Sequence, residues 1–321
     1  MTIEIQMLNE NSLIGVSSRS FSRSKELRQE LEKSFKNIRY NNALIHFDEN
    51  SLIEFFQGCE AVIVSEDKIT KKVVDSLPYL KMVAKFGVGL DSIDLKYLEK
   101  KEIKLGWQAG INCSSVAELA LSYIILMLRE AYVLNRELLN LKWKKVKNSR
   151  DLSETTIGII GFGNIGKKLA SFLSPFECKI LVFDPLIPIN EEIAGTVSSV
   201  SLDFLLKNSH AISIHVPLTK ETSNLIDTKE LSMMKKNSVL VNLSRGGVVN
   251  ETALYNFLVN KHLSGAAFDV FDEEPKNSQD FSSKLIGLNN FFSTPHIAGT
   301  SEQTIKKLGL SAINQLIENL K

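Results

Sequence analysis

The chain has 321 residues, of which 44% are hydrophobic and 23% are charged, and its formal net charge is +1. This length allows two domains with separate cores. The near-neutral charge excludes a global basic field for nucleic acid and an acidic, disordered chain. The N-terminal residues join no basic segment to an apolar run, so no secretory signal is expected.

Short apolar runs alternate with helical patterns through the first part of the chain. Between them, residues 24–35 have the apolar spacing of a helix, and Ser24 is a suitable N-cap. Early strands are predicted at "LIGVSS" (13–18), "ALIHF" (43–47), "AVIVS" (61–65) and "MVAKF" (82–86).

The most apolar long stretch spans residues 116–134 and predicts a helix over about 115–140. Glu118, Arg129 and Glu130 interrupt it, which leaves far fewer than the roughly 20 apolar residues that a membrane span needs. We expect a helix buried at a domain or subunit interface. The three cysteines are scattered, so neither a disulfide framework nor a metal site is expected, in keeping with a reducing cytoplasm.

A second series of strands follows this helix. Strands so apolar are buried on both faces, as in parallel sheets covered by helices. The sequence therefore predicts an α/β protein of two Rossmann- or flavodoxin-like doubly wound domains with a cleft between them. The strands are predicted at "TIGIIG" (156–161), "KILVFD" (179–184), "AISIHV" (211–216), "SVLVNLS" (238–244) and "GAAFDV" (265–270).

The order of these elements also predicts the domain boundaries. We expect one domain over residues 107–294 and a discontinuous one over 1–106 plus 295–321. The second part of the discontinuous domain is the terminal amphipathic helix, expected to pack back on the first domain.

"TIGIIGFGNIGKKLA" (156–170) contains Gly161, Gly163 and Gly166 in G-x-G-x-x-G spacing between an apolar strand and an amphipathic helix. In this context the glycines allow a tight turn, a close approach of the pyrophosphate, and close packing of helix on strand. Asp184 ends the next strand, where a carboxylate binds ribose hydroxyls and repels a 2′-phosphate. NAD is therefore the expected cofactor.

Three further strand ends carry candidate catalytic groups. Arg245 precedes two glycines and could hold a carboxylate or simply fix a loop. The acidic segment around Glu274 is a solvated turn or the partner of a histidine. His296, in "STPHIAG", is either a structural histidine or a general acid, whose pKa a neighbouring carboxylate would raise.

The motifs in this order resemble the D-isomer-specific 2-hydroxyacid dehydrogenases, which include D-lactate, glycerate, formate and 3-phosphoglycerate dehydrogenases. The resemblance spans residues from about 80 to 300. It rests on "KFGVGLDSIDL", "INCSSVAELAL", "GIIGFGNIG", "IHVPLT", "VNLSRGGVV", "GAAFDVFDEEP" and "STPHIAG".

The resemblance implies a role for each matching residue. Arg245 matches the substrate-binding arginine, Glu274 the partner of the histidine, and His296 the acid/base. The backbone of Gly87, Val88 and Gly89 matches the loop that holds the substrate carboxylate. The residues that match cofactor-binding positions are Gly161, Gly163, Asn164, Ile165, Gly166, Asp184, Val216, Pro217, Leu243, Ser244, Asp269 and Gly299.

The implied function is hydride transfer between the nicotinamide of NAD and C2 of a D-2-hydroxy acid or 2-keto acid. A cytoplasmic homodimer with a small acid as substrate, without nucleic acid or membrane, is expected. One alternative is an NAD-sensing protein similar to corepressors that keep the same Arg–Glu–His set. Another is a formate- or phosphite-type dehydrogenase, although the formate enzymes usually have glutamine at the position of Glu274.

Overall fold

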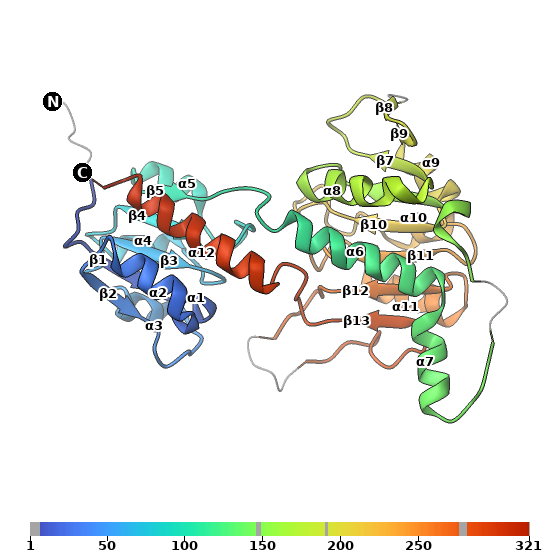
Figure 1. Ribbon diagram of the computed structural model, residues 1–321, viewed down its shortest axis with the longest axis horizontal. Coiled ribbons are helices and arrows are strands. Elements are labelled where there is room, and N and C mark those ends of the chain that lie inside the picture. The colour runs from blue at the N-terminus through green and yellow to red at the C-terminus, as the bar shows by residue number, and fades with distance from the viewer. Residues whose placement is uncertain (1–6, 146–148, 190–191, 276–280, 321) are drawn as a thin grey trace. The chain divides into compact units, whose positions relative to one another are not determined.

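The computed structural model describes residues 7–145, 149–189, 192–275 and 281–320. It divides into unit 1, residues 1–112 and 300–321, and unit 2, residues 113–299 (Figure 1). The sequence predicted boundaries at 106/107 and 294/295. The stretch 295–299, which includes His296, therefore groups with unit 2 rather than with the discontinuous domain.

Unit 1 contains a parallel five-stranded sheet in the order β2-β1-β3-β4-β5, which is the flavodoxin-like order. The C-terminal helix α12 (Glu302–Ile317) packs on this unit, as expected, and its buried Leu308, Ile313 and Leu316 join the core. The other elements are β1 (Leu13–Val16), α1 (Arg19–Arg23), α2 (Lys25–Glu32), β2 (Asn37–Tyr40), α3 (Glu49–Phe55), β3 (Ala61–Val64), α4 (Lys71–Asp75), β4 (Met82–Lys85), α5 (Leu95–Lys100) and β5 (Lys104–Gly106).

One predicted strand of unit 1 is wrong. Residues 43–47 form no strand, and the side chain of Ile45 is 50% exposed. The strand is β2 instead, which lies at the edge of the sheet and buries only one of its four residues. Such an edge strand needs no continuous apolar run, so the apolar pattern pointed to the neighbouring segment.

Unit 2 contains an eight-stranded sheet in the order β13-β12-β11-β10-β6-β7-β9-β8, in which only β8 is antiparallel. Its central order is that of a Rossmann fold, and the strand order reverses between β6 and β10. The strands are β6 (Thr156–Ile160), β7 (Lys179–Phe183), β8 (Glu192–Ala194), β9 (Val197–Ser199), β10 (Ala211–Ile214), β11 (Val239–Asn242), β12 (Gly265–Phe268) and β13 (Phe291–Ser293).

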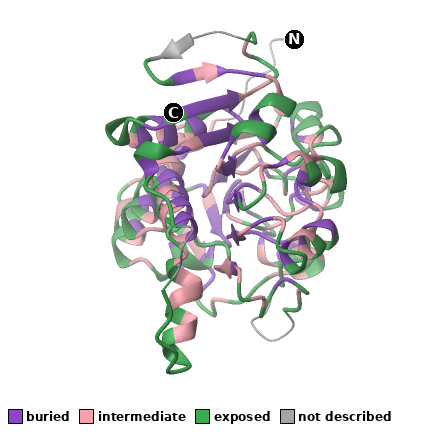
Figure 2. Cartoon of the chain, turned by 90° about the vertical axis from the view of Figure 1, so that its right-hand side faces the viewer, coloured by how far each residue is buried: buried purple, intermediate pink, exposed green. Residues whose placement is uncertain are grey.

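Helices cover both faces of this sheet, so the doubly wound prediction is confirmed. One core lies between the sheet and α6 and α8, and the other lies beneath α9, α10 and α11. Figure 2 shows the buried strands in purple between helices whose outer faces are green. The helices are α6 (Cys113–Leu128), α7 (Ala131–Leu139), α8 (Asn164–Leu173), α9 (Leu202–Asn208), α10 (Thr228–Met233) and α11 (Glu251–Val259), with short 3₁₀ turns at Leu152–Glu154 and Ser174–Phe176.

The long helix predicted over 115–140 is broken in two. Glu130 has a positive φ of 50°, a left-handed conformation that ends α6 and turns the chain into α7. The buried side chains of α6, including Val116, Ala120 and Ile124, lie in the core of unit 2. None of the described helices is both long and apolar enough to cross a bilayer.

Candidate active site

The turn after β6 contains the three motif glycines. Gly161 has a φ of +91°, and a Cβ on Gly166 would lie 2.2 Å from the carbonyl oxygen of Gly161. A Cβ on Gly163, by contrast, would meet nothing within 4 Å. Asn164 and Ile165 begin α8, and no side chain caps that helix. Its first N–H groups are therefore available to a phosphate.

Asp184 lies beside this turn, just after β7. Its Oδ2 accepts a hydrogen bond from the N–H of Phe162 at 2.8 Å, and its Oδ1 accepts one from the N–H of Leu186 at 3.0 Å. On the other side, Val216 and Pro217 follow β10, and Val216 packs against Gly161. An uncapped helix, open space over Gly163 and a carboxylate at the next strand end fit a dinucleotide without a 2′-phosphate.

The segment after β11 is organised by Asn242. Its Nδ2 donates to the carbonyl oxygen of Arg245 at 3.0 Å, and its Oδ1 accepts from the N–H and the hydroxyl of Ser244 at 3.0 and 2.8 Å. The guanidinium of Arg245 donates to the carbonyl oxygen of Ser244 at 2.7 Å, and Leu243 is buried in the core. The turn therefore fixes the backbone from which Arg245 projects.

The two glycines after Arg245 dock this turn on the loop that follows β12. A Cβ on Gly246 would lie 1.9 Å from the carbonyl oxygen of Phe271, so only glycine fits there. The N–H of Gly247, which has a φ of +77°, donates to Oδ1 of Asp272 at 2.6 Å. These contacts couple the arginine turn to the acidic loop.

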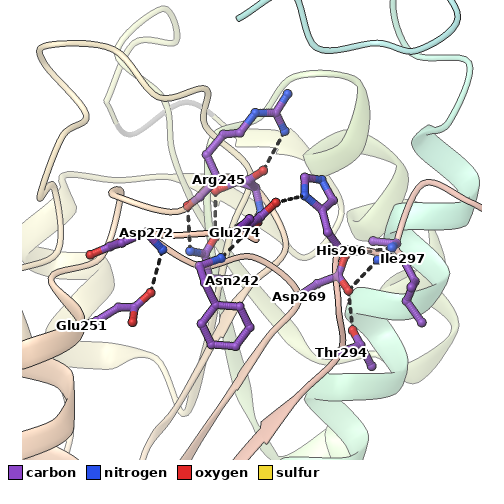
Figure 3. Close-up of polar contacts among 12 residues, drawn as sticks. Asn242, Arg245, Glu251, Asp269, Asp272, Glu274, Thr294, His296 and Ile297 are labelled. Carbon is purple, nitrogen blue, oxygen red and sulfur yellow. Dashed lines mark hydrogen bonds and ion pairs between the residues drawn. The ribbon is translucent and has the colours of Figure 1, made fainter. Parts of the chain in front are cut away.

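Glu274 and His296 form a direct pair. Nδ1 of His296 lies 2.7 Å from Oε2 of Glu274, and the other carboxylate oxygen accepts from the N–H of Phe271 at 3.1 Å. Figure 3 shows Arg245, Glu274 and His296 side by side, each from a different loop of unit 2. The His296 side chain is 48% exposed. The structure thus brings the three predicted catalytic residues together.

Charge around the pair shifts both pKa values. The hydrogen bond to Glu274 is the main cause that raises the pKa of His296; burial opposes it, and the charge of Asp269 adds to it. Burial acts to raise the pKa of Glu274, but the hydrogen bond and charge of His296, with Arg245 nearby, hold it below its usual range. The geometry therefore favours a protonated histidine against an ionised glutamate.

The loop that carries His296 is bound to Asp269. The carboxylate of Asp269 accepts hydrogen bonds from the N–H groups of Ile297 and Ala298 at 2.9 and 2.8 Å and from the hydroxyl of Thr294. Gly299 follows at the end of unit 2. Asp269 therefore holds the predicted "HIAG" segment in place.

Gly87, Val88 and Gly89 belong to unit 1 and follow β4 there. Gly87 has a φ of +150°, and the carbonyl oxygen of Val88 accepts a hydrogen bond from Nε1 of Trp107 at 2.9 Å. Within unit 1, this glycine loop lies at the carboxyl end of the sheet.

Sequence reasoning missed several residues that build the site. Asn242, Asp272 and Thr294 each hold a loop that carries a predicted residue. Asn242 and Asp272 lie inside motifs whose spacing offered a signal. Tyr123 on α6, which bonds to Thr294, gave no such signal because the two are far apart in sequence.

Comparisons with known proteins show the family to which the chain belongs. The family described as "D-isomer specific 2-hydroxyacid dehydrogenase, NAD binding domain" matches residues 121–298. A hydroxypyruvate reductase of Thermotoga maritima is 34% identical over 277 residues, which are 86% of this chain and 89% of the relative. The (S)-sulfolactate dehydrogenase of Chromohalobacter salexigens is 33% identical over 272 residues, which are 84% of this chain and 87% of the relative.

Among solved structures, D-lactate dehydrogenase from Aquifex aeolicus, complexed with NAD and lactic acid, superimposes with a TM-score of 0.79. It is 28% identical and covers 94% of this chain and 93% of its own. The motifs, the fold and these relatives agree, and the chain belongs to the D-isomer-specific 2-hydroxyacid dehydrogenases, which are NAD-dependent oxidoreductases.

Proposed function

We propose that the chain interconverts a small 2-keto acid and the corresponding D-2-hydroxy acid, with Arg245, Glu274 and His296 as its catalytic residues. The 2.7 Å contact between Nδ1 of His296 and Oε2 of Glu274 carries this proposal. Such a pair fixes the ring and raises its basicity, as general acid–base catalysis requires.

The pair leaves the other ring nitrogen for the substrate. Because Nδ1 donates to Glu274, Nε2 of His296 is the atom that gives a proton to the substrate oxygen during reduction. In oxidation, neutral His296 takes the proton at the same atom. Bound NAD supplies the nicotinamide C4 position that accepts or provides the hydride.

Arg245 is proposed to bind the substrate carboxylate and to polarise the neighbouring carbonyl. The docked turn supports this role, because Asn242 and Gly246 fix the backbone at its base. The resemblance to the family also assigns the N–H groups of the loop Gly87–Gly89, in unit 1, to substrate binding.

The cofactor is proposed to lie along the carboxyl ends of the unit 2 strands. Its pyrophosphate would bind at Gly161, Gly163, Asn164, Ile165 and Gly166, and Asp184 would bind the ribose. Val216, Pro217, Leu243, Ser244, Asp269 and Gly299 are assigned to the nicotinamide side.

The test is NADH oxidation, with NADPH in parallel, over glyoxylate, hydroxypyruvate, pyruvate, sulfopyruvate, phosphohydroxypyruvate and branched or aromatic 2-keto acids. NAD reduction with formate and phosphite completes the panel. We expect turnover with NADH on at least one 2-keto acid and a loss of about a hundredfold to ten-thousandfold in His296→Ala. Tight NADH binding without turnover on any acid would support the sensing alternative instead.

We also propose that the chain forms a homodimer through the end of α7 and the residues that follow it, up to Trp143. No residue of α7 is buried, and a nine-residue helix is marginal in water by itself. Figure 1 shows α7 extending beyond the layers of unit 2. The exposed side chains that support this surface are Leu138 (52%), Leu139 (75%), Leu141 (93%) and Trp143 (84%).

Light scattering would test this interface. Twice the chain mass is expected for the wild type and a lower mass for a Leu141→Ser, Trp143→Ser double variant. The matched control is Tyr79→Ser, an exposed aromatic side chain of unit 1. A monomeric wild type would contradict the proposal, as would a dimer unaffected by the double variant.

The proposed compartment is the cytoplasm. Cys59, Cys113 and Cys178 are all free thiols, and free cysteines are typical of reducing compartments.

A further inference from the structure

His296 has a backbone conformation that needs support from its surroundings. Its φ is +53°, which lies in the left-handed region that non-glycine residues adopt only at an energetic cost. The backbone conformation sets the position of Cβ and therefore the direction of the ring. The hydrogen bond from the ring to Glu274 depends on that direction. Whatever holds the loop therefore also holds the proposed acid.

A buried carboxylate provides that support. Asp269 is 1% exposed and accepts from the N–H groups of Ile297 and Ala298 through its two carboxylate oxygens. Its backbone carbonyl accepts from the N–H of His296 at 2.8 Å. The backbone N–H groups of His296 and of the two residues after it are thus all bonded to Asp269.

Two hydroxyl groups continue this network into α6. The hydroxyl of Thr294 donates to Oδ1 of Asp269, since an ionised carboxylate only accepts. Its single hydrogen is then used, so the Tyr123 hydroxyl, at 2.5 Å from Oγ1 of Thr294, must be the donor to Thr294.

Tyr123 is well placed for this task. Its side chain is 3% exposed, and its ring packs edge-on against Phe292 with the centroids 5.1 Å apart. Burial raises the pKa of Tyr123 to about 12, so its hydroxyl keeps the proton that it donates. The ring contact also restricts the direction of the hydroxyl.

We propose that Tyr123 is a positioning residue for His296, acting through Thr294 and Asp269. The proposal deepens the proposed function and rests on His296 being its acid/base. The hydroxyl of Tyr123 is hydrogen-bonded to Thr294 and not to the histidine itself. Its hydroxyl orients Thr294, which helps Asp269 hold the left-handed loop and so keeps the histidine ring against Glu274.

The direction of the effect follows from the charged groups that act on His296. They are Glu274 and Asp269, which raise its pKa, and Arg245, which lowers it. The bond to Glu274 outweighs the charge of Asp269. A looser loop weakens that bond, so the pKa of His296 should fall toward the ordinary value of about 6.5.

The experiment is a double-mutant cycle of Tyr123→Phe and Thr294→Val. The matched control is Tyr132→Phe, since Tyr132 packs edge-on against the same Phe292 ring but does not bond to Thr294. In Tyr123→Phe, kcat for keto-acid reduction should fall about threefold to tenfold, the effect of one lost hydrogen bond. KM for NADH should stay within about twofold, because the pyrophosphate turn is untouched.

A second readout does not depend on activity. The NMR titration of His296 in the cofactor-free protein, assigned by the resonance missing in His296→Ala, should show a lower midpoint in Tyr123→Phe than in the wild type. Tyr132→Phe should leave it unchanged. Once Thr294→Val is present, adding Tyr123→Phe should change neither kcat nor the midpoint further.

Thr294→Ser keeps the hydroxyl and should keep the response to Tyr123→Phe, which covers the case in which Thr294→Val does not fold. An unchanged midpoint in Tyr123→Phe would overturn the proposal even in an active enzyme. An effect of Tyr123→Phe that persists in Thr294→Val would also overturn it. A shifted midpoint in a chain inactive on every acid would uphold the positioning and refute only the proposed function.

Discussion

The glycine turn after β6 and the histidine loop after β13 are two tight segments of unit 2 that are held in different ways. In the glycine turn the backbone packs so closely that Gly166 has no room for a Cβ, and no side chain caps α8. In the histidine loop, hydrogen bonds from backbone N–H groups to the carboxylate of Asp269 hold a non-glycine residue in a left-handed conformation. The glycine turn depends on the absence of side chains at its glycines, and the histidine loop depends on the buried, charged side chain of Asp269.

Asp269→Asn should have the largest effect on the histidine loop. An amide cannot accept from the N–H groups of Ile297 and Ala298 and the Thr294 hydroxyl together, because its nitrogen donates. We expect the free energy of unfolding to fall by about 3–4 kcal/mol, with a marked loss of kcat. Denaturant unfolding and steady-state kinetics measure both.

Asp272→Asn is the control for that change. Asp272 is exposed, and its carboxylate accepts a single backbone hydrogen bond, from Gly247. Its loss should cost about 1 kcal/mol or less. Equal effects of the two substitutions would show that the buried network around Asp269 has no special role.

Two substitutions in the glycine turn separate packing from binding. Gly166→Ala places a methyl group against the carbonyl oxygen of Gly161 and should lower the free energy of unfolding by about 2–3 kcal/mol. Gly163→Ala meets no protein atom and should leave the melting temperature unchanged. Because the second glycine admits the pyrophosphate, Gly163→Ala should weaken NADH binding by at least about tenfold.

Calorimetry of unfolding and fluorescence titration with NADH check this pair. Normal NADH affinity in a well-folded Gly163→Ala would contradict the location proposed for the pyrophosphate. A stable Gly166→Ala would contradict the close contact between helix and turn.

Glu274→Gln should change the free energy of unfolding less than Asp269→Asn or Gly166→Ala. Its main effect should be on the pH dependence of catalysis. In the proposed mechanism keto-acid reduction needs protonated His296, so kcat/KM should fall as pH rises through the pKa of that histidine. Glu274 raises this pKa, and glutamine brings no charge. The falling limb should therefore move to lower pH.

The rising limb of hydroxy-acid oxidation should move in the same direction, because it reports the same group. Glu273→Gln removes the adjacent exposed carboxylate and is the control. If the limb stays in place in Glu274→Gln, or moves equally in Glu273→Gln, the pKa that it reports does not depend on the His296–Glu274 pair, and the prediction is contradicted.

Sequence patterns predicted the layers of both units and the residues of the three strand-end loops. The predictions were correct where a motif is local, as at Gly161–Gly166, or where a buried strand is apolar throughout, as at Ala61–Val64. They were wrong at residues 43–47, since the edge strand β2 needs no apolar run, and at Glu130, whose left-handed turn breaks an apolar helix.

The sequence by itself determined the α/β fold and the turn of the glycine motif, and its resemblance to the family singled out Arg245, Glu274 and His296 as candidate catalytic residues. The fold and the turn follow from short-range patterns, namely strand apolarity and glycine spacing. Only the tertiary structure decided how the histidine is held. Its support comes from Asp269 on the preceding strand end and, through Thr294, from Tyr123 on α6, and hydrogen bonds between such distant positions leave no periodic signal in the chain.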